Sequence, residues 1–191
     1  MFTALLDANV LVPVSLTDTI LRAAERELFL PRWSADVLDE ARRALRRIRP
    51  DVPATRLRAR FQAMNDRFPE ACVTGHEGLL KSITLPDPND RHVVAAAVVG
   101  RADVIVTRDL KHFPDDSLAP WALEAVDPDT FLRDMLDLFP DAMIRVIVDQ
   151  AADLRCPPQG VNDVLTSLQR AGVTGFVADL RARFGEVDQE E

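Results

Sequence analysis

The sequence predicts an α/β fold, an α/β/α sandwich with a central parallel sheet, followed by an α-helical C-terminal extension. Short apolar runs such as residues 103–107 alternate with helical patterns, and the links between them are short. This alternation is typical of a parallel sheet with helices on both faces, because its strands are buried on both sides. After Asp127 the strand pattern ends and only helical stripes remain. We therefore expect one domain at residues 1–128 and a helical extension at residues 129–191.

Each element of the first domain has a local signal. Ser34 is a suitable N-cap for a helix that runs to Arg49, and Pro50 ends that helix. The apolar residues of the next helix, Leu57 to Phe68, recur at helical spacing on one side. Strands are expected at residues 2–7, 28–30 (short, or a turn), 103–107 and 122–126. Further helices are expected at residues 17–27, around 79–80, and from the opening segment 87–90 to Gly100.

Four acidic residues lie at strand ends or on the adjoining helices: Asp7, Glu40, Asp90 and Asp109. The carboxyl ends of parallel strands border the ligand crevice of an open α/β sheet, so these acids are expected to converge. A carboxylate cluster suits a hard cation such as Mg²⁺ or Mn²⁺, which prefers oxygen ligands and keeps some of its water.

Several of these acids also have a purely structural explanation. Asp87 followed by Pro88 is an N-cap signature, which places Asp90 at the third helical position, where the helix dipole favours an acid. Asp7 could cap the loop after its strand with the help of Asn9. Glu40 is the least explained by local structure, because it lies beyond the first turn of its helix and beside the apolar stripe.

The overall composition is that of a soluble globular protein. The chain has 191 residues, of which 47% are hydrophobic and 28% charged, and no apolar run is long enough to span a membrane. With no signal peptide pattern, a cytoplasmic location is expected. The two cysteines, Cys72 and Cys156, are far apart and lack metal-ligand spacing, so both are interpreted as reduced structural thiols.

Positive charge is concentrated in one segment of an acidic chain. The net charge is −8, yet residues 42–67 contain nine arginines against two aspartates. Such a block is a candidate phosphate-binding face, because guanidinium groups pair with phosphate oxygens. A solvated helical hairpin and a docking site for a protein partner are the alternatives. The candidate contacts to a phosphate-bearing ligand, such as a nucleic acid, or to a protein partner are Arg42, Arg43, Arg46, Arg47, Arg56 and Arg60.

Four ordered blocks of the sequence resemble the PIN domain, in particular the VapC-type toxins of bacterial toxin–antitoxin pairs. The blocks are Leu5–Leu11, Pro31–Glu40, Leu85–Val93 and Val106–Pro114. The resemblance spans about residues 2–128, and the helices that follow resemble the C-terminal extension of a subset of these toxins. It implies a metal-dependent endoribonuclease that acts on RNA and pairs with an antitoxin protein. It leaves open whether the protein is a homodimer.

The same resemblance assigns roles to single residues. It makes Asp7, Glu40, Asp90 and Asp109 the catalytic quartet, in which Asp7, Asp90 and Asp109 hold Mg²⁺ or Mn²⁺. Asn9 and Thr107 then orient the ligands. Close relatives have an aspartate where this chain has His112, so a second metal is not implied and His112 is interpreted as a phosphate contact or a surface histidine. His76 and His92 are interpreted as structural.

Two other classes compete with a ribonuclease. A phosphatase of the haloacid dehalogenase type also has an aspartate after its first strand, but it usually has a second aspartate two residues later, where this chain has Asn9. A degenerate PIN fold that only binds RNA or protein is the other alternative, and the complete quartet argues against it.

Overall fold

The computed structural model describes residues 2–155, 158 and 160–187, and the chain divides into two compact units. The first unit contains the N-terminal segment up to Val12 together with Phe29–Asp127. The second contains Pro13–Leu28 and the chain from Pro128 onward. The expectation that Cys156 is a reduced thiol concerns a residue outside the described part.

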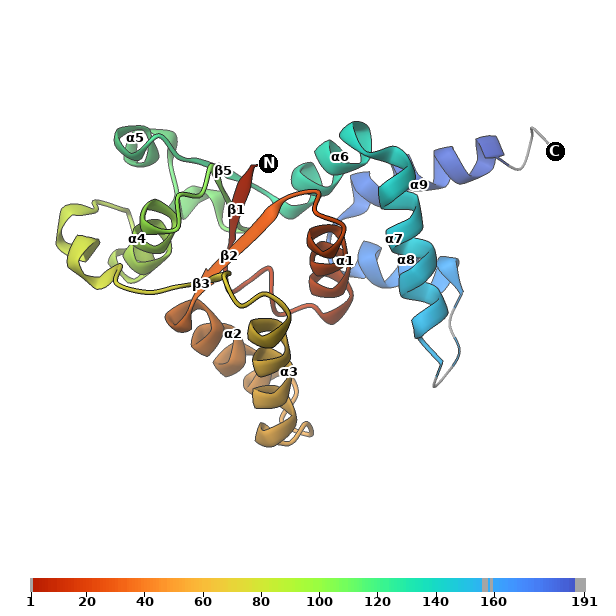
Figure 1. Ribbon diagram of the computed structural model, residues 1–191, viewed down its shortest axis with the longest axis horizontal. Helices are drawn as coiled ribbons and strands as arrows, with labels where there is room; N and C mark the ends of the chain where they lie inside the picture. Colours follow the sequence, from red (N-terminus) through yellow and green to blue (C-terminus); the bar gives the residue numbers. More distant parts are fainter. Residues whose placement is uncertain (1, 156–157, 159, 188–191) are drawn as a thin grey trace. The chain divides into compact units, whose positions relative to one another are not determined.

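A parallel five-stranded sheet forms the centre of the first unit (Figure 1). Its order is β3-β2-β1-β4-β5, and every pair of neighbours is parallel, which confirms the predicted sheet. Strand β2 begins at Leu30, where the predicted segment 28–30 ends, and β3 was not predicted, because two residues are too few to show a pattern. The strands are β1 (Thr3–Leu6), β2 (Leu30–Ser34), β3 (Cys72–Val73), β4 (Val104–Val106) and β5 (Glu124–Val126).

Helices flank this sheet, and the local signals in the sequence explain several of them. The Ser34 hydroxyl accepts a hydrogen bond from the Val37 amide and caps α2, as predicted. Helices α2 and α3 pack side by side as a hairpin (Figure 1). The elements are α2 (Ala35–Ile48), α3 (Ala54–Arg67), η1 (Glu77–Ser82), η2 (Pro88–Asp90), α4 (Arg91–Val99), η3 (Leu110–His112), α5 (Asp115–Leu118) and η4 (Ala119–Trp121).

Helix α4 is the most apolar helix of this unit and packs on the sheet. It contacts β1, β2 and β4, and Val93–Ala97 are buried without a break. Gly100 follows the helix where the chain passes closely over β3, since a Cβ there would lie 2.8 Å from the Val73 side chain. This packing fixes the N-terminus of α4, and with it Asp90, relative to the strand ends.

Strand order creates a switch point between β1 and β4. From β1 the chain continues to β2 and β3 on one side of β1, and β4 then pairs with β1 on its other side. Leu6 and Val106 are paired at the carboxyl ends of these two strands, so the residues that follow them emerge next to each other. Ligands of open α/β sheets bind at such a point.

The second unit is helical. It combines α1 (Val14–Glu25) with α6 (Pro128–Leu138), α7 (Pro140–Asp153), α8 (Val161–Arg170) and α9 (Thr174–Val187). The segment 13–28, which the sequence analysis placed in the first domain, packs here because its buried face meets α7 and α8. Among the described residues, no helix is long and apolar enough to cross a membrane.

A buried glutamine ties α1 to α7 within this unit. Gln150 is 1% exposed, accepts a 2.7 Å hydrogen bond from the Thr19 hydroxyl and donates one to the Ser15 carbonyl. Because a buried amide is costly unless it is paired, these contacts specify how the two helices dock. The sequence shows Gln150 only as a polar residue within an apolar stripe, which explains why the docking of α1 was not predicted.

Candidate active site

Asp7 lies immediately after β1 and is held by hydrogen bonds to the end of β4. Its Oδ2 accepts from the Thr107 hydroxyl and from the Asn9 side-chain amide, each at 2.7 Å. Its Oδ1 accepts from the Ala8 amide at 2.6 Å. Three donors therefore converge on one carboxylate, and its orientation is fixed before any ligand arrives.

Asn9 connects Asp7 to Asp109. Its side-chain nitrogen also lies 3.1 Å from the Thr107 hydroxyl oxygen and 3.4 Å from Asp109 Oδ2, while its oxygen accepts from the Arg108 amide. The Asp109 amide donates to the Thr107 hydroxyl at 3.2 Å. The structure thus brings Asp7, Asn9, Thr107 and Asp109 into one hydrogen-bonded group.

Asp7 is poised between its protonated and ionised forms. It is only 7% exposed, and this burial raises its pKa from 3.8 to about 6, with the charges of Glu40 and Asp90 adding to the effect. The hydrogen bonds from Thr107 and the Ala8 amide oppose the rise without cancelling it. A divalent cation at this position would remove the cost of the negative charge.

Asp90 forms a second cluster with Asp87 and His112. One ligand atom from each of the three lies within 4.8 Å of the other two, and His112 Nδ1 is 2.9 Å from Asp90 Oδ2. That oxygen is buried, yet the contact with His112 lacks the alignment of a hydrogen bond. Burial and the nearby Asp87 charge raise the pKa of Asp90, partly offset by His112.

The ligand atoms of this cluster are placed so that a divalent cation could bind among them. A buried carboxylate oxygen without a hydrogen bond is costly unless a cation approaches it. Carboxylate oxygens are the ligands that Mg²⁺ and Mn²⁺ prefer, and the imidazole nitrogen of His112 shifts the preference away from Mg²⁺ toward transition-metal cations. Among the described residues, this trio is the group whose ligand atoms already converge, and Asp7 and Asp109 are not part of it.

The carboxylate of Glu40 contacts a histidine side chain. His92 Nε2 lies 3.4 Å from Glu40 Oε2. This contact lowers the pKa of Glu40 below its usual value, and the charges of Arg43 and Arg47 lower it further. Burial opposes protonation of His92, but Glu40 still raises the histidine's pKa. Glu40 is therefore held ionised beside the site, with about half of its side chain exposed.

A cavity of about 1160 Å³ opens beside these acids. Glu40 and Asp90 lie on its lining together with Asp36, so negative charge is present in the cavity wall. Five cationic side chains line the same space, namely Arg43, Arg46, Arg47, Lys81 and Arg91. A mixed lining of this kind fits a substrate that carries both a cation and several phosphates.

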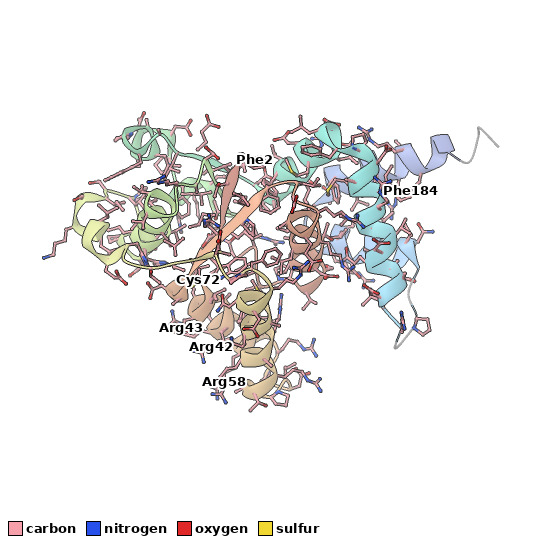
Figure 2. The ribbon with its side chains drawn as sticks, in the orientation of Figure 1. Phe2, Arg42, Arg43, Arg58, Cys72 and Phe184 are labelled. Atoms are coloured by element: carbon pink, nitrogen blue, oxygen red, sulfur yellow. The ribbon has the colours of Figure 1, made fainter. Side chains whose placement is uncertain are left out.

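The structure divides the six predicted arginine contacts. Arg43, Arg46 and Arg47 line the cavity, whereas Arg42 forms a 2.8 Å ion pair with Asp39. Arg60 donates to the Leu11 carbonyl at 3.0 Å, which gives it a structural role. Arg56 is exposed on α3. Figure 2 shows Arg42 and Arg43 on α2 and Arg58 on α3, the hairpin that carries the whole block.

Three side chains acquire roles that the sequence analysis did not assign. Asp87 accepts from the Asn89 amide at 2.9 Å, as expected of a cap, but it also faces Asp90 and His112. His112 contacts Asp90, and His92 contacts Glu40. These pairs join residues 22 and 52 positions apart, so no local spacing could have indicated them.

A comparison with known families agrees with this geometry. A model of the PIN domain matches residues 3–111, more than half of the chain. The chain belongs to the PIN domain family. A second model, described as the VapC50 C-terminal domain, matches residues 128–182 and thus covers α6 to α8 and most of α9. The resemblance seen in the sequence is confirmed for both parts of this PIN protein.

One curated relative has a substantial identity to this chain. It is a Mycobacterium tuberculosis protein named "Putative ribonuclease VapC50", 46% identical over 95 residues. The match covers 50% of this chain and 56% of the relative, so the chain spans little more than half the length of that protein. No solved structure matches the chain.

Proposed function

We propose that this PIN protein is a ribonuclease that hydrolyses RNA phosphodiesters with the help of Mg²⁺ or Mn²⁺. The observation that carries the proposal is the position of Asp90. Its buried Oδ2 meets His112 Nδ1 at 2.9 Å beside the Asp87 carboxylate, and Asp90 lies on a large cavity lined by five cations. Membership of the PIN family and the name of the M. tuberculosis relative support the same activity.

The chain's own residues would prepare the site as follows. Asp90, Asp7 and Asp109 would hold the cation, directly or through water, and Asn9 would keep Asp7 and Asp109 in register. Glu40, kept ionised by His92, would orient the attacking water. Arg43 and Arg47 would fix the phosphate over the acids. When bound, a divalent cation supplies charge neutralisation at the phosphate and lowers the pKa of water.

Asp87 and His112 offer a second ligand set around the same Asp90. In this set the cation would contact Asp87, Asp90 and His112, the trio whose ligand atoms converge in the structure. Asp7 would then act as a neighbouring charge and not as a ligand. Asp90 belongs to both sets and would therefore bind the cation in either case.

We also propose that the chain is the toxin of a toxin–antitoxin pair and has a protein antitoxin as its partner. The match of residues 128–182 to the VapC50 C-terminal domain and the likeness to the M. tuberculosis relative support this role. Induced expression in a bacterium is then expected to arrest growth, and sequencing of RNA ends after induction is expected to reveal the cleavage sites.

A comparison of substrates tests the proposed activity. Purified protein with Mn²⁺ is expected to cut total bacterial RNA at internal positions and to leave p-nitrophenyl phosphate intact, with excess EDTA abolishing the cleavage. Release of nitrophenol would favour a phosphomonoesterase instead. Tight RNA binding without cleavage in either metal would indicate a degenerate PIN fold that acts as a binding module.

A further inference from the structure

Two cations outside the arginine block lie on the same cavity as the α2 arginines. Lys81 belongs to η1 and Arg91 is the first residue of α4, and both line the space that Arg43 and Arg47 line from α2. The cavity therefore receives positive charge from three separate elements. The arginine block on α2 and α3 accounts for only one of them.

Arg91 has a polar atom that the protein leaves unsatisfied. Its Nε is buried and has no hydrogen-bond partner within the described residues. A buried N–H group without an acceptor costs about 1–3 kcal/mol, so such a group in a native structure calls for an explanation. Because Arg91 lines the cavity and follows Asp90 directly, its guanidinium is placed to meet an anionic ligand over Asp90.

Lys81 is exposed and is also free of carboxylate partners. Over the part of the chain that the structure describes, neither Lys81 nor Arg91 forms an ion pair, whereas Arg42 pairs with Asp39 and Arg49 pairs with Asp51. In a chain with 31 acidic residues against 23 lysines and arginines, unpaired cations facing one cavity indicate a ligand that is itself negatively charged.

We propose that Lys81 and Arg91 bind phosphates of the RNA strand and hold it against the α2 arginines. The inference rests on the proposed ribonuclease function and extends it to a second row of contacts. Arg91 would pair with a phosphate through its guanidinium fork, next to the acids at Asp90. Lys81, which lies on η1, would place its single positive charge against a neighbouring phosphate. Contacts from both sides would fix the path of the strand over Asp90.

Salt dependence of RNA binding tests this row of contacts. Binding of fluorescein-labelled oligouridylate is measured in EDTA at several salt concentrations, so that cleavage does not interfere. Each of Lys81→Gln and Arg91→Gln is expected to reduce the slope of log affinity against log salt by about 0.7, the value for one phosphate contact on a single strand. In cleavage assays the same variants are expected to raise KM and to leave kcat within about twofold, because the lost contacts position the substrate.

A matched control is Arg58→Gln, which removes one charge from α3 at an exposed position outside the cavity lining. Its slope is expected to equal that of the wild type. Slopes of Lys81→Gln and Arg91→Gln that also equal the wild-type slope would overturn the inference. If Arg91→Gln is poorly folded by circular dichroism, the exposed Lys81→Gln decides alone. A wild type that binds RNA but never cuts it would contradict the proposed function, and the slopes would still decide this inference.

Discussion

Replacing Asp90 with asparagine is expected to reduce RNA cleavage by at least about a hundredfold and to leave the protein folded. Asp90 belongs to both candidate ligand sets, and even the outer partners of metal ligands typically contribute ten- to a hundredfold. Its side chain makes no capping hydrogen bond to α4, so asparagine leaves the start of this helix intact and weakens only the contact with His112. Cleavage rates with Mn²⁺, together with a far-UV spectrum, measure both parts of the expectation.

Two matched variants show which ligand set holds the cation. Asp87→Asn keeps the cap on η2, because asparagine caps about as well as aspartate. Nearly full activity of Asp87→Asn with strong loss in Asp109→Asn would support the set Asp7, Asp90 and Asp109. The reverse pattern would support Asp87, Asp90 and His112. Full activity of Asp90→Asn would rule out both sets.

Asp7 is expected to make the metal-free protein less stable as the pH rises from about 4 to above 6. The folded state holds the pKa of Asp7 at about 6, against an ordinary value of 3.8, so the folded protein binds an extra proton between these two pH values. The raised pKa therefore does not change the stability of the folded state below pH 3.8, and the folded state loses stability as the pH rises through about 6. At 1.36 kcal/mol per pKa unit, the loss at neutral pH is at most roughly 3 kcal/mol.

Thermal melts of the wild type and Asp7→Asn in EDTA isolate this contribution. Glu40, Asp90 and His92 also titrate, but they do so in both proteins, so their effects largely cancel in the difference. The melting temperature of the variant relative to the wild type is expected to rise by several degrees between pH 4 and pH 7. The donor of asparagine faces the Asn9 amide, which lowers the variant's stability by the same amount at every pH. A difference that does not change with pH would show that burial does not govern Asp7.

Much of the fold could be predicted from sequence because its signals are local. The parallel sheet follows from short apolar runs such as β4, and α2 follows from the Ser34 cap and the buried stripe behind it. The two-residue β3 and the docking of α1 onto α7 could not be predicted. The first is too short for a pattern, and the second depends on a buried glutamine network between distant segments.

The sequence predicts the part of the site whose residues directly follow the strands. Asp7 and Thr107 follow paired residues at the ends of β1 and β4, so their hydrogen bond is a consequence of topology. The contacts of His92 with Glu40 and of His112 with Asp90 depend on how α2, α4 and η3 are placed in space. Arg60 was predicted to contact a ligand because it belongs to the arginine block, but its guanidinium donates to the Leu11 carbonyl, a contact that the sequence does not indicate.

Binding of Mn²⁺ to the protein without RNA tests the central claim most directly. Electron paramagnetic resonance measures free Mn²⁺ as protein is added, for the wild type, Asp90→Asn and the surface control Arg58→Gln. We expect the wild type and the control to bind Mn²⁺ equally and Asp90→Asn to bind at least tenfold more weakly. Wild-type protein that leaves Mn²⁺ free, or an Asp90→Asn variant that binds it as tightly as the wild type, would contradict the assignment of a divalent-cation site to these acids.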